Sequence, residues 1–173
     1  MIRVWSRVVI YFLVFVLLQV LVMNNIHLFR LVTPFVYIYV ILKLPVDMTR
    51  SATILISFLL GLVVDIFSNT FGMHAAACSF IGFVRMPLLD RFVDVKDLPE
   101  QSIPSYSLFG YAKFIRYALV LVVLHHVTLF VIEAFTFFQP LFMVMRMMLS
   151  ILLSFLLILI IEAFNLGKKK SGE

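Results

Sequence analysis

Charged residues and cysteine are both scarce in this 173-residue chain. Asp, Glu, Lys and Arg make up 13% of it, against about 25% in an ordinary soluble domain. Hydrophobic residues reach 64%, and a soluble protein of this length has too much surface to hide so many apolar side chains. The one cysteine, Cys78, excludes an intrachain disulfide. Because it lies in an apolar run, we expect it to be a small packing residue.

The sequence also lacks the short alternation of apolar and polar residues that is typical of membrane barrel strands. Its hydrophobic runs are instead long and continuous. In lipid, every backbone N–H and C=O must be satisfied within the protein, which leaves only helices or closed barrels. The predicted fold class is therefore an all-α polytopic membrane protein, a single domain over residues 1–173 that is surrounded by membrane lipid.

Six transmembrane helices are predicted from the apolar runs and from the polar, Gly and Pro residues between them. No small-residue cleavage site follows the first run, so we expect a retained span rather than a signal peptide. Pro34 is expected to kink the second span or to mark its first turn. No internal repeat supports an inverted-repeat transporter. The six spans cover residues 4–22, 29–42, 52–67, 72–89, 112–138 and 141–164.

The net charge of +5 does not indicate a nucleic-acid partner, because the basic residues lie in short loops and at the C-terminus. Their placement predicts the topology instead. With both termini in the cytoplasm, every Lys and Arg except Arg30 and Arg146 lies on the cytoplasmic side, as the positive-inside rule favours. The longest polar stretch, residues 90–113, is then cytoplasmic. It is either a solvated connector or a docking site for a cytoplasmic partner.

Ionisable side chains inside the predicted spans need a partner, because a charge in the membrane interior is costly. Several of them are expected at a similar depth near the outer ends of the spans. We expect the carboxylates to pair with guanidinium groups, whose geometry suits bidentate contact. Two interpretations stay open: structural pairs that fix helix register, or a polar pocket for a ligand or a partner. The set is Asp65, His74, Glu133, Arg30 and Arg146.

Neither metal binding nor catalysis is predicted for the remaining polar residues. His126 and Glu133 share a helix face but lie about 10 Å apart along its axis, which is too far for a shared metal ion. His125 is expected to point elsewhere. No nucleophile occurs with a base and an orienting group. We therefore predict that the protein is not an enzyme and has no cofactor.

Small residues mark the fourth predicted span as a central, tightly packed helix. Ala75 with Ser79, and Cys78 with Gly82, follow the small-xxx-small spacing of membrane helix contacts. Near the inner end of the sixth span, Glu162 is expected to meet the cytoplasmic lysines or Arg116.

One motif resembles a known family. Residues 61–75, GLVVDIFSNTFGMHA, are similar to the core motif of the MreD family of bacterial rod shape-determining membrane proteins. In that family a Gly and an Asp end one span, a short turn follows, and Gly-x-His opens the next span. The matching positions are Gly61, Asp65, Gly72 and His74. Length, span count, short loops and the basic tail also agree over nearly the whole chain.

The resemblance implies a non-enzymatic part of the cell-elongation machinery in the bacterial inner membrane. Such proteins bind MreC, and are linked to the MreB cytoskeleton and to RodA with its transpeptidase. Their roles are regulation of cell shape and organisation of peptidoglycan synthesis. The resemblance also implies a fold similar to the substrate-binding subunits of energy-coupling-factor transporters. That fold raises an alternative function, a small-molecule-binding subunit of a vitamin-type transporter.

Overall fold

The computed structural model describes residues 2–25, 32–134 and 140–170, and this part of the chain is built from helices without a β-strand. The predicted all-α class is therefore confirmed. The elements are α1 (Ile2–Leu21), η1 (Met23–Asn25), α2 (Ile38–Leu42), α3 (Arg50–Ser68), α4 (Met73–Phe92), η2 (Val95–Asp97), α5 (Tyr106–Phe109), α6 (Tyr111–Ala134) and α7 (Pro140–Lys170).

Four helices within the described ranges are long and apolar enough to cross a membrane. They are α1 over Val4–Leu21, α3 over Arg50–Ser68, α6 over Tyr111–Ala134 and α7 over Leu141–Asn165. The α4 helix has the same length as α1 but is less apolar, because His74, Arg85 and Asp90 interrupt its hydrophobic residues. The described chain is thus all-helical, with four helices that could span a membrane.

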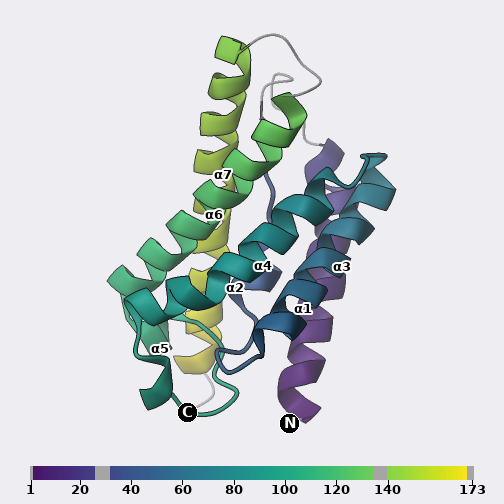
Figure 1. Cartoon of the computed structure of the whole chain (residues 1–173). Helices are drawn as coiled ribbons and strands as arrows, with labels where there is room; N and C mark the ends of the chain where they lie inside the picture. The colour runs from purple at the N-terminus through teal and green to yellow at the C-terminus, as the bar shows by residue number, and fades with distance from the viewer. Residues whose placement is uncertain (1, 26–31, 135–139, 171–173) are drawn as a thin grey trace.

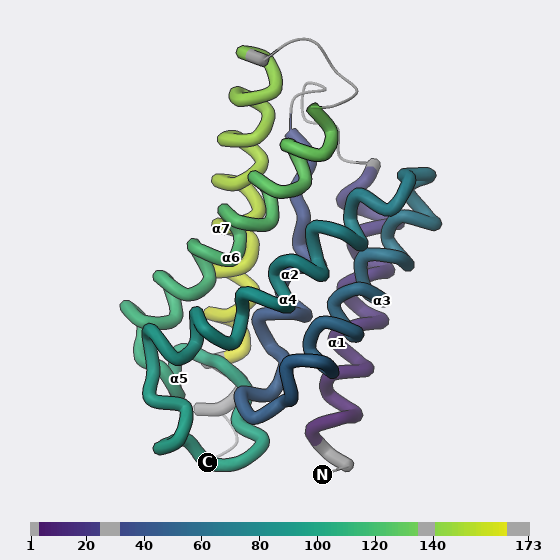
Figure 2. The backbone as a smooth tube through the Cα atoms, in the orientation of Figure 1, coloured from purple at the N-terminus to yellow at the C-terminus, as the bar shows by residue number. Residues whose placement is uncertain are grey.

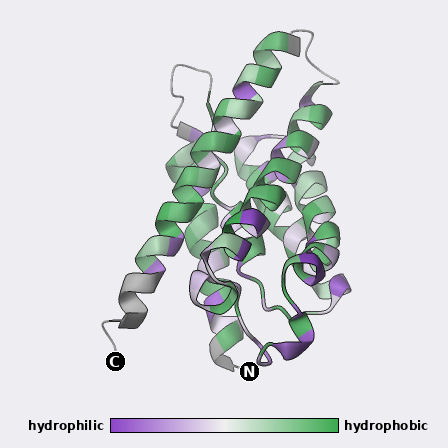
Figure 3. Cartoon of the chain, turned by 90° about the vertical axis from the view of Figure 1, so that its left-hand side faces the viewer, coloured by the Kyte–Doolittle hydropathy of each residue, from purple (hydrophilic) through white to green (hydrophobic). Residues whose placement is uncertain are grey.

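The long helices form a bundle in which α1 and α3 run in the same direction, whereas α3, α4, α6 and α7 alternate in direction (Figures 1 and 2). Contacts join α1 to α3, α3 to α4, α4 to α6, and α6 to α7. The two ends of the described chain lie at the same end of the bundle (Figure 1). Hydrophilic residues gather in the loops at this end, whereas apolar residues follow the lengths of the helices (Figure 3). We call this the terminal end of the bundle.

The prediction of one continuous helix over residues 29–42 is wrong for residues 32–42, the part of this range that the structure describes. Residues 32–37 are not helical, and only the five residues of α2 form a helix. This segment contacts α1, α4 and α6, and residues 34–46 are all buried. Pro34 lies in non-helical backbone rather than at a kink or first helical turn; it lacks an N–H, and it disfavours helical backbone in the residue before it. An apolar run that is buried on all sides has the same composition as a membrane helix, so hydropathy did not separate the two.

The other predicted spans coincide with helices whose ends differ by a few residues. The helices α1, α3 and α4 cover the predictions 4–22, 52–67 and 72–89 to within three residues. The prediction 112–138 corresponds to α6, which is described to Ala134, so residues 135–138 lie outside the described part. The prediction 141–164 is shorter than α7, which continues to Lys170.

The connector over residues 90–113 is partly folded. It contains η2 and the short helix α5, whose N-cap Ser105 accepts a hydrogen bond from the Leu108 backbone N–H at 3.2 Å. Tyr106 and Phe109 are buried, and α5 packs against α6 and α7. The connector therefore packs against part of the terminal end of the bundle, while its charged residues, such as Asp90 and Glu100, are exposed.

Candidate functional site

The Asp65 carboxylate caps the N-terminus of α4. Its Oδ1 accepts hydrogen bonds from the His74 backbone N–H at 3.1 Å and from the Thr70 hydroxyl at 2.5 Å. Its Oδ2 accepts from the Ala75 backbone N–H at 2.8 Å. The N-cap position of α4 is Gly72, which has no side chain to fulfil this role. Asp65 thus supplies both the missing acceptor and a negative charge at the positive end of the helix.

Both motif glycines are required by the joint between α3 and α4. Gly72 has a φ of +77°, a left-handed conformation that favours glycine. Gly61 lies where α3 meets the start of α4, and a Cβ there would be 2.4 Å from the His74 carbonyl oxygen. The four residues that carry the family resemblance, Gly61, Asp65, Gly72 and His74, therefore act together in one helix–turn–helix joint.

Two of the small residues of α4, Ala75 and Gly82, lie at its contact with α3. Ala75 and Cys78 are buried, and a Cβ on Gly82 would be 2.7 Å from the Ser57 hydroxyl oxygen of α3. Ser79 bonds within its own helix, to the Ala75 carbonyl at 2.7 Å. The two helices approach closely because these side chains are small.

His74 belongs to a buried polar chain through the middle of the bundle. Its Nδ1 lies 2.8 Å from the Tyr37 hydroxyl, which lies 2.7 Å from Nε2 of His125. Tyr37 and His125 are fully buried. The expectation that His125 points away from the polar interior is therefore wrong. His125 and His126 are both fully buried, and their ring centroids lie 5.8 and 5.3 Å from that of Phe35.

The non-helical backbone at residues 33–36 is satisfied by polar side chains of α1 and α7. The Gln19 amide donates to the Pro34 carbonyl and accepts from the Val36 N–H, both at 3.0 Å. The hydroxyls of Ser150 and Ser154 accept from the backbone N–H groups of Thr33 and Phe35 at 3.2 and 2.8 Å. Irregular backbone is tolerated at membrane depth only where the protein supplies such partners.

Sequence reasoning missed Gln19, Ser150 and Ser154 as structural partners. They are isolated polar residues in apolar runs, and that isolation is the signal that could have found them.

The four described members of the predicted five-residue polar set do not form one cluster. Glu133 and Arg146 form an ion pair at 3.0 Å, which confirms one predicted carboxylate–guanidinium pair, between α6 and α7. Asp65 bonds to backbone N–H groups instead of to Arg146, because the N-terminus of α4 already offers it two donors. Arg30 lies outside the described residues. The set is therefore divided between two places in the bundle.

Two further charged sites lie toward the terminal end. Arg85 is fully buried, and its guanidinium donates to the carbonyls of Leu44 and, at 3.3 Å, Pro45, and to the Tyr117 hydroxyl at 3.1 Å. Its guanidinium thus holds the chain that leaves α2. Neutral groups thus solvate the charge of the Arg85 guanidinium. No carboxylate among the described residues pairs with it.

The second site is the buried ion pair of Lys43 and Glu162, at 2.8 Å. The prediction that Glu162 meets a lysine is confirmed. The Tyr39 hydroxyl donates to Glu162 Oε2 at 2.6 Å, and the Tyr106 backbone N–H donates to Oε1 at 3.3 Å. Burial raises the pKa of the Tyr106 phenol, and the nearby Glu162 carboxylate adds to that rise. Tyrosine, lysine and backbone together fix α7 to the connector and to α2.

The arrangement offers little for chemistry. No group of three or more metal-ligating side chains occurs among the residues that the structure describes. The Cys78 sulfur lies 4.0 Å from His125 Nε2, but Cys78 is fully buried, so a substrate has no access to it. Within the described structure, two buried side-chain polar atoms, Ser57 Oγ and His125 Nδ1, have no hydrogen-bond partner.

Comparisons with known proteins do not assign this chain to a family. No family model, no curated protein and no solved structure matches the chain.

Proposed function

We propose that this protein is a non-enzymatic membrane adaptor of the bacterial cell-elongation machinery, similar to MreD. It binds MreC, and through it acts with MreB and with RodA and its transpeptidase to maintain rod shape and organise peptidoglycan synthesis. One observation carries the proposal: the residues of the resemblance form a structural joint. Gly61 permits the close approach of α3 and α4, and Asp65 caps α4. A motif that builds a joint suits an adaptor better than an enzyme.

The proposed topology has six crossings of the inner membrane and both termini in the cytoplasm. The second crossing is the buried segment at residues 32–42 rather than a continuous helix. Two observations support this topology. The described ends of the chain lie at the same end of the bundle (Figure 1), and the sequence places all but two of its basic residues on that side. A fold similar to that of the substrate-binding subunits of energy-coupling-factor transporters is part of the same proposal.

The outer faces of α1 and α7 are the surfaces proposed to meet a partner helix. On α1, Leu13 and Leu17 are each 55% exposed, and on α7, Leu152 and Ile160 are 55% and 51% exposed. Because MreC has a single span, its contact with a protein of short loops includes packing of one helix against another. Apolar faces of this kind support that contact.

The experiment that tests the proposal uses the native cysteine content of the chain. Cys78 is buried and is the only cysteine, so it gives no background crosslink. Leu17→Cys and Leu152→Cys each place one accessible thiol on α1 or α7, to be combined with cysteines along the span of MreC. We expect oxidative crosslinks from one face, co-purification of MreC in mild detergent, and loss of rod shape when the protein is depleted. Depleted cells that stay rod-shaped, together with absence of MreC from the purified protein, would falsify the proposal.

A second candidate is a small-molecule-binding subunit of a vitamin-type transporter. The observation that favours it is the interrupted crossing, since transporters bind substrates where membrane helices are broken. In this protein, however, Gln19 and Ser154 already occupy the backbone groups of that segment. A co-purifying metabolite and an uptake defect with normal cell shape would favour the transporter over the adaptor.

A further inference from the structure

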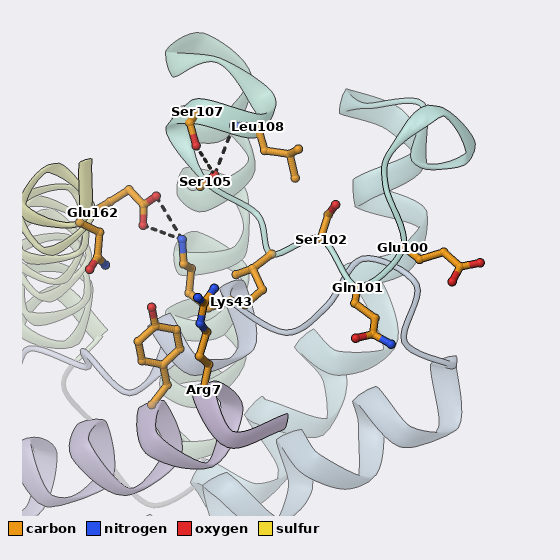
Figure 4. Close-up of a pocket in the computed structure, with 12 residues that line it drawn as sticks. Arg7, Lys43, Glu100, Gln101, Ser102, Ser105, Ser107, Leu108 and Glu162 are labelled. Carbon is orange, nitrogen blue, oxygen red and sulfur yellow. Dashed lines mark hydrogen bonds and ion pairs between the residues drawn. The ribbon is translucent and has the colours of Figure 1, made fainter. Parts of the chain in front are cut away.

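A cavity of about 670 Å³ opens at the terminal end of the bundle, between the start of α1, the end of α7 and the connector (Figure 4). Its size falls in the range of about 300–1,000 Å³ that is usual for small-ligand sites. Lys43 and Glu162 lie on its inner wall, and side chains of α1, of the connector and of the end of α7 line the rest. The lining residues used below are Arg7, Tyr11, Lys43, Gln101, Ser107 and Glu162.

The buried acid in this cavity is not available to a ligand. Both oxygens of Glu162 accept hydrogen bonds, Oε2 from Tyr39 and Lys43, and Oε1 from Lys43 and the Tyr106 N–H. The Lys43 ammonium is saturated as well, because it also donates to the Pro104 carbonyl. The inner wall is therefore a neutral pair whose hydrogen bonds are complete, and it offers no site for a cation.

The lining groups that remain available to a ligand are hydrogen-bond donors. Arg7 is exposed, and within the described ranges no acidic side chain pairs with its guanidinium. In Figure 4 this guanidinium points toward Lys43. The Tyr11 hydroxyl and the Gln101 side-chain amide likewise have no hydrogen-bond partner among the described residues. The other acid at the rim, Glu100, is exposed and points away from Arg7 (Figure 4). The uncompensated charge that faces the cavity is thus positive.

The position of the cavity along the candidate membrane spans indicates which class of anion it could bind. Arg7 lies near the start of the candidate span Val4–Leu21, and Asn165, also in the lining, ends the candidate span Leu141–Asn165. These positions fall where the hydrocarbon core of a bilayer gives way to its headgroups. Donors from α1 and from the connector surround the space on more than one side, which suits a tetrahedral oxyanion.

We propose that this cavity binds a phosphate group, with Arg7 as its charged ligand and with Tyr11, Gln101 and Ser107 as neutral donors. The phosphate belongs either to a phospholipid headgroup or to a soluble phosphate. The inference does not depend on the adaptor function, since it rests on the cavity alone.

The test compares Arg7→Gln with Arg116→Gln in the full-length protein. Both variants remove one exposed arginine, but Arg116 lies on α6 and does not line the cavity. Delipidated protein in detergent is titrated with phosphatidylglycerol, and bound lipid is counted by native mass spectrometry. A parallel titration uses inorganic phosphate and measures thermal stability. Thermal unfolding in the absence of either probe reports whether each variant is folded.

We expect saturable binding to the wild type, a loss of affinity of about tenfold or more in Arg7→Gln, and no loss in Arg116→Gln. Binding of phosphatidylglycerol alone identifies a lipid site, whereas stabilisation by inorganic phosphate identifies a soluble ligand. Absence of saturable binding by both probes, or an equal loss in both variants, overturns the proposal. If Arg7→Gln does not fold, Tyr11→Phe and Gln101→Ala take its place, and unchanged affinity in both also overturns it.

Discussion

The Asp65 Oδ2 atom lies 2.8 Å from the backbone nitrogen of Ala75, so a carboxylate of α3 caps the helix that follows it. This contact explains how a nearly fully buried acid, 2% exposed, is tolerated without an arginine partner among the described residues. Backbone N–H groups at a helix N-terminus satisfy the lone pairs of the carboxylate and balance part of its charge. The same contact fixes the turn between α3 and α4.

Replacing this cap should destabilise the protein. Asp65→Ala leaves the N–H groups of His74 and Ala75 without an acceptor, and we expect a loss of about 0.5–2 kcal/mol in the free energy of unfolding. Asp65→Asn keeps an oxygen acceptor but loses the charge, so its effect should be smaller. The measurement is unfolding by SDS in mixed micelles. Asp90→Ala, an exposed acid at the other end of α4, is the matched control; equal effects of Asp65→Ala and Asp90→Ala would contradict the capping role.

Gly61 should not tolerate a larger side chain. A Cβ at this position would lie 2.4 Å from the His74 carbonyl oxygen and 2.6 Å from the Ala75 Cα, which are backbone atoms that cannot move aside alone. We expect Gly61→Val to separate α3 from α4 and to cost at least about 1–3 kcal/mol. Ala76→Val adds bulk on the exposed side of α4 and serves as the control. Membrane abundance and SDS unfolding are measured, and wild-type stability of Gly61→Val would show that the helices are not in close contact there.

The Tyr37 hydroxyl should stabilise the polar chain between His74 and His125. Tyr37→Phe keeps the ring but leaves two buried imidazole nitrogens without their partner, at a cost of about 1–3 kcal/mol. His125 is the more affected, because its Nδ1 already has no hydrogen-bond partner within the described structure. Tyr111→Phe removes a hydroxyl from an exposed residue and should have no effect. A thermal unfolding midpoint of Tyr37→Phe that equals the wild-type value would argue against this chain.

The Lys43–Glu162 pair should behave as one unit. Removing one partner of a buried ion pair leaves an uncompensated charge, and we expect Lys43→Met or Glu162→Gln alone to cost about 3–5 kcal/mol. The double variant removes both charges, so it should be less destabilised than the sum of the two single variants. SDS unfolding of the four proteins gives the coupling free energy. Strict additivity would mean that the two side chains do not interact.

Much of the architecture was predictable from the sequence because hydropathy reports directly on transfer out of water. The long apolar runs of α1, α3, α6 and α7 determined the class and the approximate ends of these helices. The joint between α3 and α4 was also present in the sequence as a motif, since Gly72 and Asp65 are local requirements of one turn. Local backbone geometry and hydrophobicity are properties that a sequence carries by itself.

Tertiary structure alone decided where the second apolar run goes and what the buried polar groups contact. Lipid and protein interior are both apolar environments, so the composition of residues 29–42 fits either a lipid-facing helix or a buried irregular segment. Only tertiary packing selects the buried irregular segment. The helices α1 and α7 pack around it, and Gln19 and Ser154 form hydrogen bonds with its backbone. For the same reason Asp65 was predicted to bind arginine and instead caps a helix. A buried charge requires compensation, but the sequence does not state whether a side chain or the backbone supplies it.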